Sequence, residues 1–352
     1  MNNLALHAEI LATINRVYGF VQAGDKLRKG ECPVCKKREL WTDYENPWVL
    51  RCPRENNCGA EIHIKEAHPE IFERLNERYP ATTANPSATA DAYMQLQRGL
   101  KSPLLVGSYR QGQYYNPTII GKNKATATVL FDLGGGVTME RFVETVTVKD
   151  PDNGDLVRRK QHFSGSHKGQ WWAPASQIIK PGDDVYIVEA CIDACSLITA
   201  GFKAVAILSA GNYPALSLTK ADKTVRWVWA LDGDKAGRRF AKKHHDRMQQ
   251  AGYKVAAALP PAGAKKVDWN DLHQANRLTP AHMATYHYYG SLLVAPNAFD
   301  KALLMYAQTE VNSFQLDFNH RWYWFALNSA KFSKALEEMA AGREPPTADE
   351  LL

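Results

Sequence analysis

Two apolar segments that end abruptly in acidic side chains constrain the fold of this chain most. Residues 185–193 read Val-Tyr-Ile-Val-Glu-Ala-Cys-Ile-Asp, and residues 227–234 read Trp-Val-Trp-Ala-Leu-Asp-Gly-Asp. Short apolar runs bounded by charge are typical of strands buried in a parallel sheet. Because sites in such sheets lie beyond the carboxyl ends of the strands, we expect Glu189, Asp232 and Asp234 at one sheet edge. Crowded carboxylates require a cation, and Mg²⁺ or Mn²⁺ is the usual partner of oxygen ligands.

The composition is that of a globular protein with several domains. The 352 residues are 45% hydrophobic and 23% charged, which is enough for two or three domains. A net charge of +6 fits a polyanionic partner without requiring one. No apolar run approaches the roughly 18 residues of a membrane span, and the N-terminus does not resemble a signal peptide. We therefore expect a cytoplasmic protein with no membrane partner.

Four of the six cysteines have the spacing of a structural zinc site. Cys32 and Cys35 form a Cys-x-x-Cys pair, and Cys52 and Cys58 follow after a hairpin-length spacer. In a reducing compartment such clustering favours metal binding over disulfides. Four thiolates satisfy tetrahedral zinc, so we predict one structural Zn²⁺ in a zinc ribbon. His63 is an alternative ligand, although four cysteines suffice.

Two tryptophans of the spacer, Trp41 and Trp48, lie among basic residues. Aromatic rings and cations together suit single-stranded nucleic acid, because bases stack on the rings while the cations contact phosphates. Tryptophans of so small a module can equally fill its core. We predict template stacking by Trp41 and Trp48, with the core role as the alternative.

Changes in composition divide the chain into five parts. Residues 1–80 are expected to form the zinc-ribbon domain, with flanking helices over 4–22 and 63–79, and residues 81–91, small and polar with prolines, are expected to be a linker. Residues 92–180 are expected to form a basic α+β subdomain. Its expected strands are 114–120, 126–132, 139–148 and 157–163.

Residues 181–295 alternate strand and helix patterns, which predicts a parallel sheet covered by helices. Residues 296–352 are expected to form a helical and aromatic extension. The fold class is thus multidomain α/β: a zinc ribbon, a mixed α+β basic subdomain, a parallel-sheet domain and a helical tail.

The acidic residues of the parallel-sheet domain are spaced for one site. Asp193 follows Glu189 by one helical turn, and Asp232 and Asp234 can both face the same side across Gly233. The next helix is expected to begin at Lys235, and helix N-termini hold phosphates well. Two basic residues lie in its first turn and are candidates for nucleotide binding, Lys235 and Arg238.

Segments 188–197 and 231–237 resemble the two signature motifs of the Toprim domain, which bacterial-type primases, topoisomerases and some nucleases share. With a zinc ribbon ahead of it, the domain order resembles primases of the bacterial and phage helicase-primase type. The family usually has Gly after the first Glu, whereas this chain has Ala190. The resemblance implies a Rossmann-like sheet, with Glu189 as general acid/base or metal organiser.

The resemblance further implies that Asp232 and Asp234 hold the catalytic Mg²⁺ and that Asp193 supports the metal site. Segment 266–272 resembles a later Lys-x-Asp-x-Asn-Asp element of the family. Asp268 and Asp271 are therefore candidates for a second metal position. Capping of the following helix by Asp271 is an equally good interpretation.

The family has a basic subdomain before the Toprim fold, and this chain has basic residues in the corresponding stretch. Arg98 begins an Arg-Gly-Leu element like that of the family, and Lys168 precedes a glycine and aromatic residues. Singly, such residues are usually solvated surface charges; as a group they favour a triphosphate or template site. The remaining candidates are Arg158, Arg159 and Lys160, and Lys168 is also a candidate catalytic residue.

The resemblance implies a DNA primase, which makes short RNA primers on a single-stranded DNA template from ribonucleoside triphosphates. Phage, plasmid or other mobile-element replication is the expected setting, with a replicative helicase, fused or separate, as a candidate partner. No Walker-type Gly-x-x-x-x-Gly-Lys-Ser/Thr occurs in the chain. The alternatives are a Toprim-type metal-dependent nuclease and a non-catalytic single-stranded DNA-binding replication module.

Overall fold

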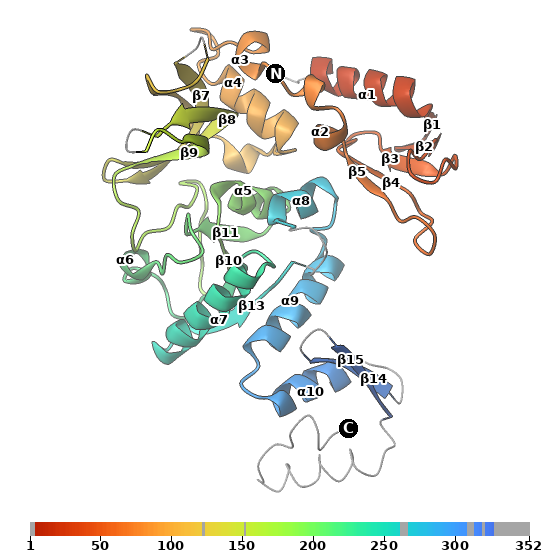
Figure 1. The fold of residues 1–352 in the computed structure, drawn as a ribbon. Helices are drawn as coiled ribbons and strands as arrows, with labels where there is room; N and C mark the ends of the chain where they lie inside the picture. The colour runs from red at the N-terminus through yellow and green to blue at the C-terminus, as the bar shows by residue number, and fades with distance from the viewer. Residues whose placement is uncertain are drawn as a thin grey trace, which may run out of the picture.

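Three successive parts of the chain meet around one short helix, α8 (Trp269–Gln274) (Figure 1). The computed structural model describes residues 4–121, 124–150, 153–260, 267–307, 313–318 and 321–326. Side chains of α8 bond to the backbone of residues 97–99, and the chain just after it bonds to the zinc-ribbon part. None of the described helices has the length and apolar character needed to cross a membrane.

The first part is a helix packed beside a small antiparallel sheet. α1 (Leu4–Tyr18) ends where Gly19 takes a φ of 65°, so the expected helix does not continue to residue 22. The sheet follows chain order: β1 (Val21–Ala23), β2 (Lys26–Gly30), β3 (Leu40–Asp43), β4 (Val49–Arg51) and β5 (Glu61–His63). β3 and β4 lie between the two cysteine pairs.

The helix expected over 63–79 is broken into short turns. They are α2 (Ile64–Ala67), the 3₁₀ turn η1 (Pro69–Ile71) and α3 (Leu75–Arg78). Pro69 has no backbone N–H and disfavours helical conformation in the residue before it, which ends α2 at Ala67.

The second part is an antiparallel meander behind a helix with a widened last turn. α4 (Ala88–Ala92) continues into the π-helical turn η2 (Tyr93–Gln97), and η3 (Pro103–Leu105) follows. Residues 88–91, expected in the linker, belong to α4, where Thr89 is buried and its hydroxyl donates to the Tyr79 carbonyl at 2.7 Å. Buried helical residues cannot act as a flexible linker.

The sheet of the second part has the order β6–β7–β8–β9, with all neighbours antiparallel. Its strands are β6 (Arg110–Tyr115), β7 (Ala125–Gly134), β8 (Val137–Lys149) and β9 (Leu156–Ser164). The first strand was expected at 114–120, but Pro117 lacks an N–H and Asn116 forms a turn through its side chain with the Thr118 N–H.

The third part has the parallel sheet that the sequence predicts. Strand order is β11–β10–β12–β13, and every pair is parallel. The elements are β10 (Asp184–Val188), α5 (Cys191–Thr199), β11 (Lys203–Ala206), α6 (Ala215–Leu218), β12 (Arg226–Trp229), α7 (Lys235–Gln250) and β13 (Lys254–Ala257). Alternate residues of β12 fill different cores: Trp227 and Trp229 pack on one face and Val228 on the other. Both faces of the sheet are therefore buried, as parallel sheets require.

Two further helices and a hairpin complete the described chain. α9 (Pro280–Val294) packs along β13, and α10 (Ala298–Ala307) follows it. The aromatic stretch of the expected helical tail forms an antiparallel hairpin, β14 (Ser313–Phe318) and β15 (Arg321–Ala326). The tail from residue 327 onwards lies outside the described residues.

Gly290 allows α9 to approach the edge of the sheet closely. A Cβ at this position would overlap the backbone of Ala257 and Ala258. We predict that Gly290→Ala lowers the free energy of unfolding by about 1–3 kcal/mol, the usual cost of overpacking. Urea denaturation measures the change. Thr285→Ala, on the exposed side of the same helix, is the control and should shift stability far less; equal effects would refute the close-approach explanation.

Candidate metal and nucleotide site

The predicted acidic residues gather at the carboxyl edge of the parallel sheet. Glu189 directly follows β10, and its carbonyl accepts from the Leu208 N–H at 2.7 Å, which joins the ends of β10 and β11. Asp232 follows β12 and is only 6% exposed, and Asp193 lies buried in the first turn of α5. Asp234 is the N-cap of α7, with its carboxylate accepting from the Gly237 N–H at 2.8 Å. Strand ends and helix starts therefore place all four predicted residues at this edge.

Gly237 explains how α7 begins so close to the end of β12. A Cβ at residue 237 would overlap the backbone of Asp232. The Asp-x-Asp-x-Ala-Gly pattern thus has a steric basis: its glycine lets the helix start directly over the strand end. The N-terminus of α7 and the two aspartates consequently share one small region.

The buried carboxylates of this edge repel one another. Burial raises the pKa of Asp193 well above its usual range, and the neighbouring charges of Asp268 and Asp232 raise it further. The Asn270 N–H donates to Asp193 at 3.2 Å, and Arg98 offsets part of the repulsion. An all-oxygen donor set with excess negative charge fits Mg²⁺ or Mn²⁺, which would supply Lewis-acid stabilisation of phosphate oxygens. That Glu189, Asp232 and Asp234 hold such an ion stays a prediction of the sequence.

The two acids at the start of α8 cap that helix. Asp268 accepts from the Asp271 N–H at 2.7 Å, and Asp271 accepts from the Asp268 N–H at 3.2 Å, which forms a capping box. Burial, followed by repulsion from Asp268, raises the pKa of Asp271. The capping interpretation is thus confirmed for Asp271, and the second metal position stays a prediction. Lys266 of this segment lies outside the described residues.

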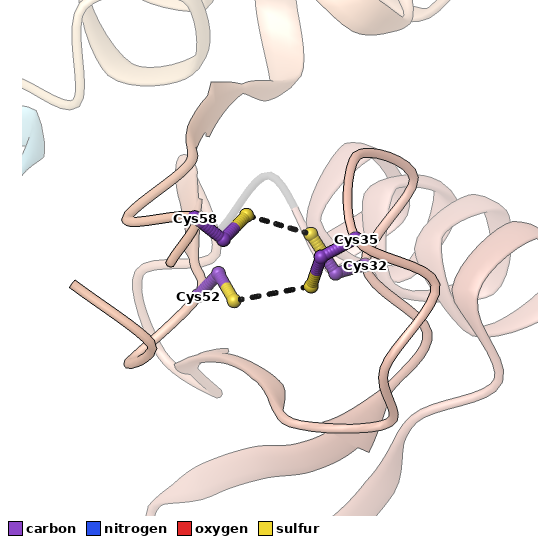
Figure 2. Close-up of side chains that lie close together, drawn as sticks. All are labelled: Cys32, Cys35, Cys52 and Cys58. Carbon is purple, nitrogen blue, oxygen red and sulfur yellow. Dashed lines mark hydrogen bonds between the residues drawn. The ribbon is translucent and has the colours of Figure 1, made fainter. Parts of the chain in front are cut away.

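The four cysteines of the zinc ribbon converge on one point (Figure 2). Their sulfur atoms all lie within 4.8 Å of one another, and the Cys32–Cys58 and Cys35–Cys52 sulfurs are 3.8 Å apart. Zn–S bonds of about 2.3 Å in a tetrahedron require S···S separations of about 3.8 Å. A backbone hydrogen bond from Lys37 is the main cause that lowers the pKa of the Cys35 thiol to about 7. The cluster therefore fits one structural Zn²⁺.

The cysteines are the only compact metal-ligand group in the part of the chain that the structure describes. The sheet-edge carboxylates are more widely spread than the sulfurs. Mg²⁺ keeps several waters and takes only one or two carboxylates directly, so it does not need so closed a cage.

Cys35→Ser should abolish stoichiometric zinc binding, because three sulfurs and a hydroxyl hold zinc poorly. Metal analysis of the purified protein is expected to fall from one zinc per chain to a small fraction. Cys195→Ser is the matched control, since Cys195 is buried in α5. Zinc loss in the control as well, or zinc retained in Cys35→Ser, would contradict this assignment.

Of the predicted basic residues, some are partly buried and others are exposed to solvent. Arg98 is partly buried where the three parts meet, and its guanidinium bonds to the Tyr93 hydroxyl. Lys168 is exposed and lines a cavity of about 940 Å³ that reaches Ser209 at the end of β11. The side chains on the edge strand β9 and at the start of α7 are mostly exposed: Arg158, Arg159, Lys160 and Lys235. Arg238 is half-buried and donates to the Gly233 carbonyl at 2.8 Å.

The two ribbon tryptophans differ in their surroundings. Trp41 is half-buried between cations, with Lys26 Nζ 4.5 Å and Arg51 Cζ 5.4 Å from its ring centre. Trp48 packs against the main core, with its ring 6.1 Å from that of Phe72. Trp41 thus has the better surroundings for base stacking, and Trp48 also has the core role that was the alternative.

Comparison with known proteins identifies part of the chain. Residues 186–273 match the family model described as Toprim-like. This segment is a Toprim-like domain. No curated protein matches the chain.

Solved structures of primases are similar to the chain at low identity. The Aquifex aeolicus primase (zinc-binding and RNA polymerase domains) matches with 14% identity and a TM-score of 0.36, covering 87% of this chain and 96% of that one. The DnaG catalytic core matches with 18% identity and a TM-score of 0.38, covering 67% and 88%. The primase fragment of the bacteriophage T7 primase-helicase matches with 15% identity and a TM-score of 0.28, covering 73% and 96%.

Sequence reasoning missed several residues around the Toprim-like edge. Asn270 is 1% exposed; its amide donates to the Arg98 carbonyl at 2.8 Å and to the Ser196 hydroxyl at 3.0 Å. Asn270 lies inside segment 266–272, which stands out in the sequence for its aspartates, so its position in that segment could have marked it as a site residue. Arg141 donates to the Tyr93 hydroxyl, as Arg98 does, and Lys65 is close enough for the charge of Arg98 to act on it. Both residues come from distant segments with no motif of their own.

Asp193→Asn should stabilise the protein in magnesium-free buffer, because it removes one buried charge from a repelling group. The melting temperature at pH 8 is expected to rise by a few degrees at most, since about 1 kcal/mol shifts it by about 2–4 °C in a protein of about 150–250 residues and by less in a larger one. Added Mg²⁺ should raise the melting temperature of the wild type more than that of the variant. A variant that melts lower than the wild type without Mg²⁺ would contradict the repulsion.

Proposed function

We propose that the protein is a DNA primase that polymerises ribonucleotides into short RNA primers on single-stranded DNA. Mg²⁺ or Mn²⁺ at the sheet edge is the required ion. Glu189, Asp232 and Asp234 would hold it, and the basic residues before the Toprim-like domain would bind the triphosphate and template.

The observation that carries this proposal is the direct contact between the zinc ribbon and the residues that immediately follow the Toprim-like segment. Arg51 of β4 donates to the Ala275 carbonyl just after α8, and Asn276 donates to Asp43 of β3 at 2.6 Å. α8 in turn begins at the acidic edge with Asp268. A ribbon that holds single-stranded DNA would therefore hold it within reach of the metal-binding carboxylates.

The position of Arg98 also favours nucleotidyl transfer. Phosphoryl transfer is mostly positioning and neutralisation of charge, so a cation is needed beside the metal site. Burial opposes the charge on Arg98, but Tyr93 and then the charges of Asp268 and Asp193 raise the pKa of its guanidinium above the usual range. A triphosphate bound between this arginine and the metal would be neutralised from two sides. A nuclease shares the carboxylates, but a cleaved phosphodiester has no triphosphate to neutralise.

This arrangement assigns a role in the reaction to each group of side chains. The carboxylates would orient the ion, Arg98 and Lys168 would hold phosphate oxygens, and Trp41 between its two cations would stack on a template base. Glu189 would take part as general acid/base or metal organiser. The replicon served, whether phage, plasmid or another mobile element, and a helicase partner stay predictions of the sequence.

The direct test is incorporation of labelled ribonucleotides on random single-stranded DNA with Mg²⁺ present. Asp232→Asn should reduce primer synthesis by at least about 100-fold, because loss of a metal-holding charge removes several kcal/mol of stabilisation at about 1.4 kcal/mol per tenfold. Asp246→Asn, a half-buried aspartate of α7 that pairs with Lys242 and His245, is the matched control and should retain activity.

The same assay distinguishes the alternatives. Cleavage of the DNA without incorporation would identify a nuclease. Binding of the DNA with neither reaction would identify a non-catalytic module. Unchanged primer synthesis by Asp232→Asn would show that the sheet edge is not the catalytic centre.

A further inference from the structure

The hydroxyl of Tyr93 receives hydrogen bonds from two arginines. The ring is 2% exposed, and its oxygen lies 3.0 Å from Arg98 Nε, 2.7 Å from Arg98 Nη2 and 3.1 Å from Arg141 Nε. Tyr93 comes from η2 and Arg141 from β8, so the phenol ties the helix to the sheet of the second part. Neither Tyr93 nor Arg141 carries a role in the proposed function.

The π-helical turn explains how Tyr93 and Arg98 meet. In an α-helix of 3.6 residues per turn, residues five apart point in different directions. The wider i→i+5 turn of a π-helix places such residues one above the other. Tyr93 begins η2 and Arg98 follows its last residue. The irregular turn is therefore the local feature that builds the contact.

The hydrogen-bond geometry determines the charge on the phenol. A guanidinium can only donate hydrogen bonds, so all three contacts point N–H groups at one oxygen. A neutral phenol oxygen has two lone pairs and must direct its own proton to an acceptor. A phenolate oxygen has three lone pairs and no proton, which matches the three donors. The arrangement suits the phenolate.

We propose that Tyr93 is a buried tyrosinate that acts as a positioning residue, holding the Arg98 and Arg141 guanidiniums in one fixed cluster beside the Toprim-like edge. The phenolate supplies a negative charge at a point where the surrounding side chains are cationic. Without it, two guanidiniums that converge on one atom would repel each other.

The charges on the neighbouring elements agree with this assignment. Lys65 on α2 of the zinc-ribbon part bonds to the Gln97 amide oxygen at 3.0 Å and acts on Tyr93 by its charge, with Lys160 on β9 further out. Asp193 and Asp268 face the cluster from α5 and α8 through Arg98. Burial alone would raise the pKa of Tyr93, but the charges of Arg98, Arg141 and Lys65 outweigh it and lower the pKa to about 7.

The consequence for activity rests on the proposed function. Arginines held by a phenolate are preorganised for the triphosphate, whereas free ones must be ordered during binding. A Tyr93→Phe enzyme should therefore show a KM for ribonucleoside triphosphates raised about tenfold, with kcat reduced less, as expected for lost hydrogen bonds to charged groups.

The test that does not depend on activity is a spectrophotometric titration at 295 nm, where tyrosinate absorbs. One of the fifteen tyrosines should ionise near pH 7 in the native protein, and Tyr93→Phe should lack this step. Tyr109→Phe is the matched control: Tyr109 donates to Asp91, and burial together with that carboxylate raises its pKa, so its removal should leave the step intact.

Arg141→Gln provides a second variant that keeps the tyrosine. Loss of one cation should move the step to higher pH without abolishing it. The ionised phenol stabilises the fold, so its contribution is complete above pH 10 and is lost as pH falls through about 7. The melting temperature of the wild type minus that of Tyr93→Phe should accordingly increase as the pH is raised from 6.5 to 9.

A native protein with no tyrosine ionising below pH 9 would overturn the proposal, as would a step that survives Tyr93→Phe. The outcomes for the two hypotheses are separate. A tyrosinate in a protein that makes no primers would refute the proposed function and leave the tyrosinate established. Primer synthesis without the absorbance step would refute the tyrosinate alone.

Discussion

Mutual repulsion of carboxylates at the end of a parallel sheet is the constraint on which the rest of the structure depends. Parallel strands deliver their carboxyl ends to one edge, and here β10 and β12 deliver Glu189 and Asp232, while α5 adds buried Asp193. Such a group persists only with compensating partners. The Asn270 N–H, the charge of Arg98 and the proposed ion supply that compensation.

The contacts that offset the repulsion between carboxylates also hold the three parts of the chain together. α8, at the C-terminal end of the Toprim-like segment, bonds to the chain that follows η2: Asn270 to the Arg98 carbonyl and His273 to the Gly99 carbonyl at 2.9 Å. The residues just after it bond to the ribbon. One short helix therefore links the zinc site to the acidic edge, and a displaced ribbon would disturb the same helix that presents Asp268.

Local patterns in the sequence predicted what depends on local chemistry. Cysteine spacing predicted the sulfur cluster, and apolar runs that end in acids predicted the parallel sheet and its edge. The ends of helices were harder to predict, because the apolar periodicity continues past Gly19 and Pro69 although these residues end α1 and α2. The contacts of Trp48 with Phe72, and of Tyr93 with Arg141, join residues far apart in the chain. No local pattern encodes such contacts, so Arg98 was a candidate from the sequence, but its cluster with Tyr93 and Arg141 became visible only in the fold.

The central claim is that the carboxyl edge of the Toprim-like domain holds the catalytic ion. Anomalous X-ray diffraction from crystals soaked in Mn²⁺ tests it most directly, because manganese scatters anomalously and prefers the same oxygen ligands as magnesium. A peak is expected among Glu189, Asp232 and Asp234, and it should vanish in Asp232→Asn crystals, while a zinc peak remains at the four cysteines. A manganese peak elsewhere, with none at this edge, would contradict the claim.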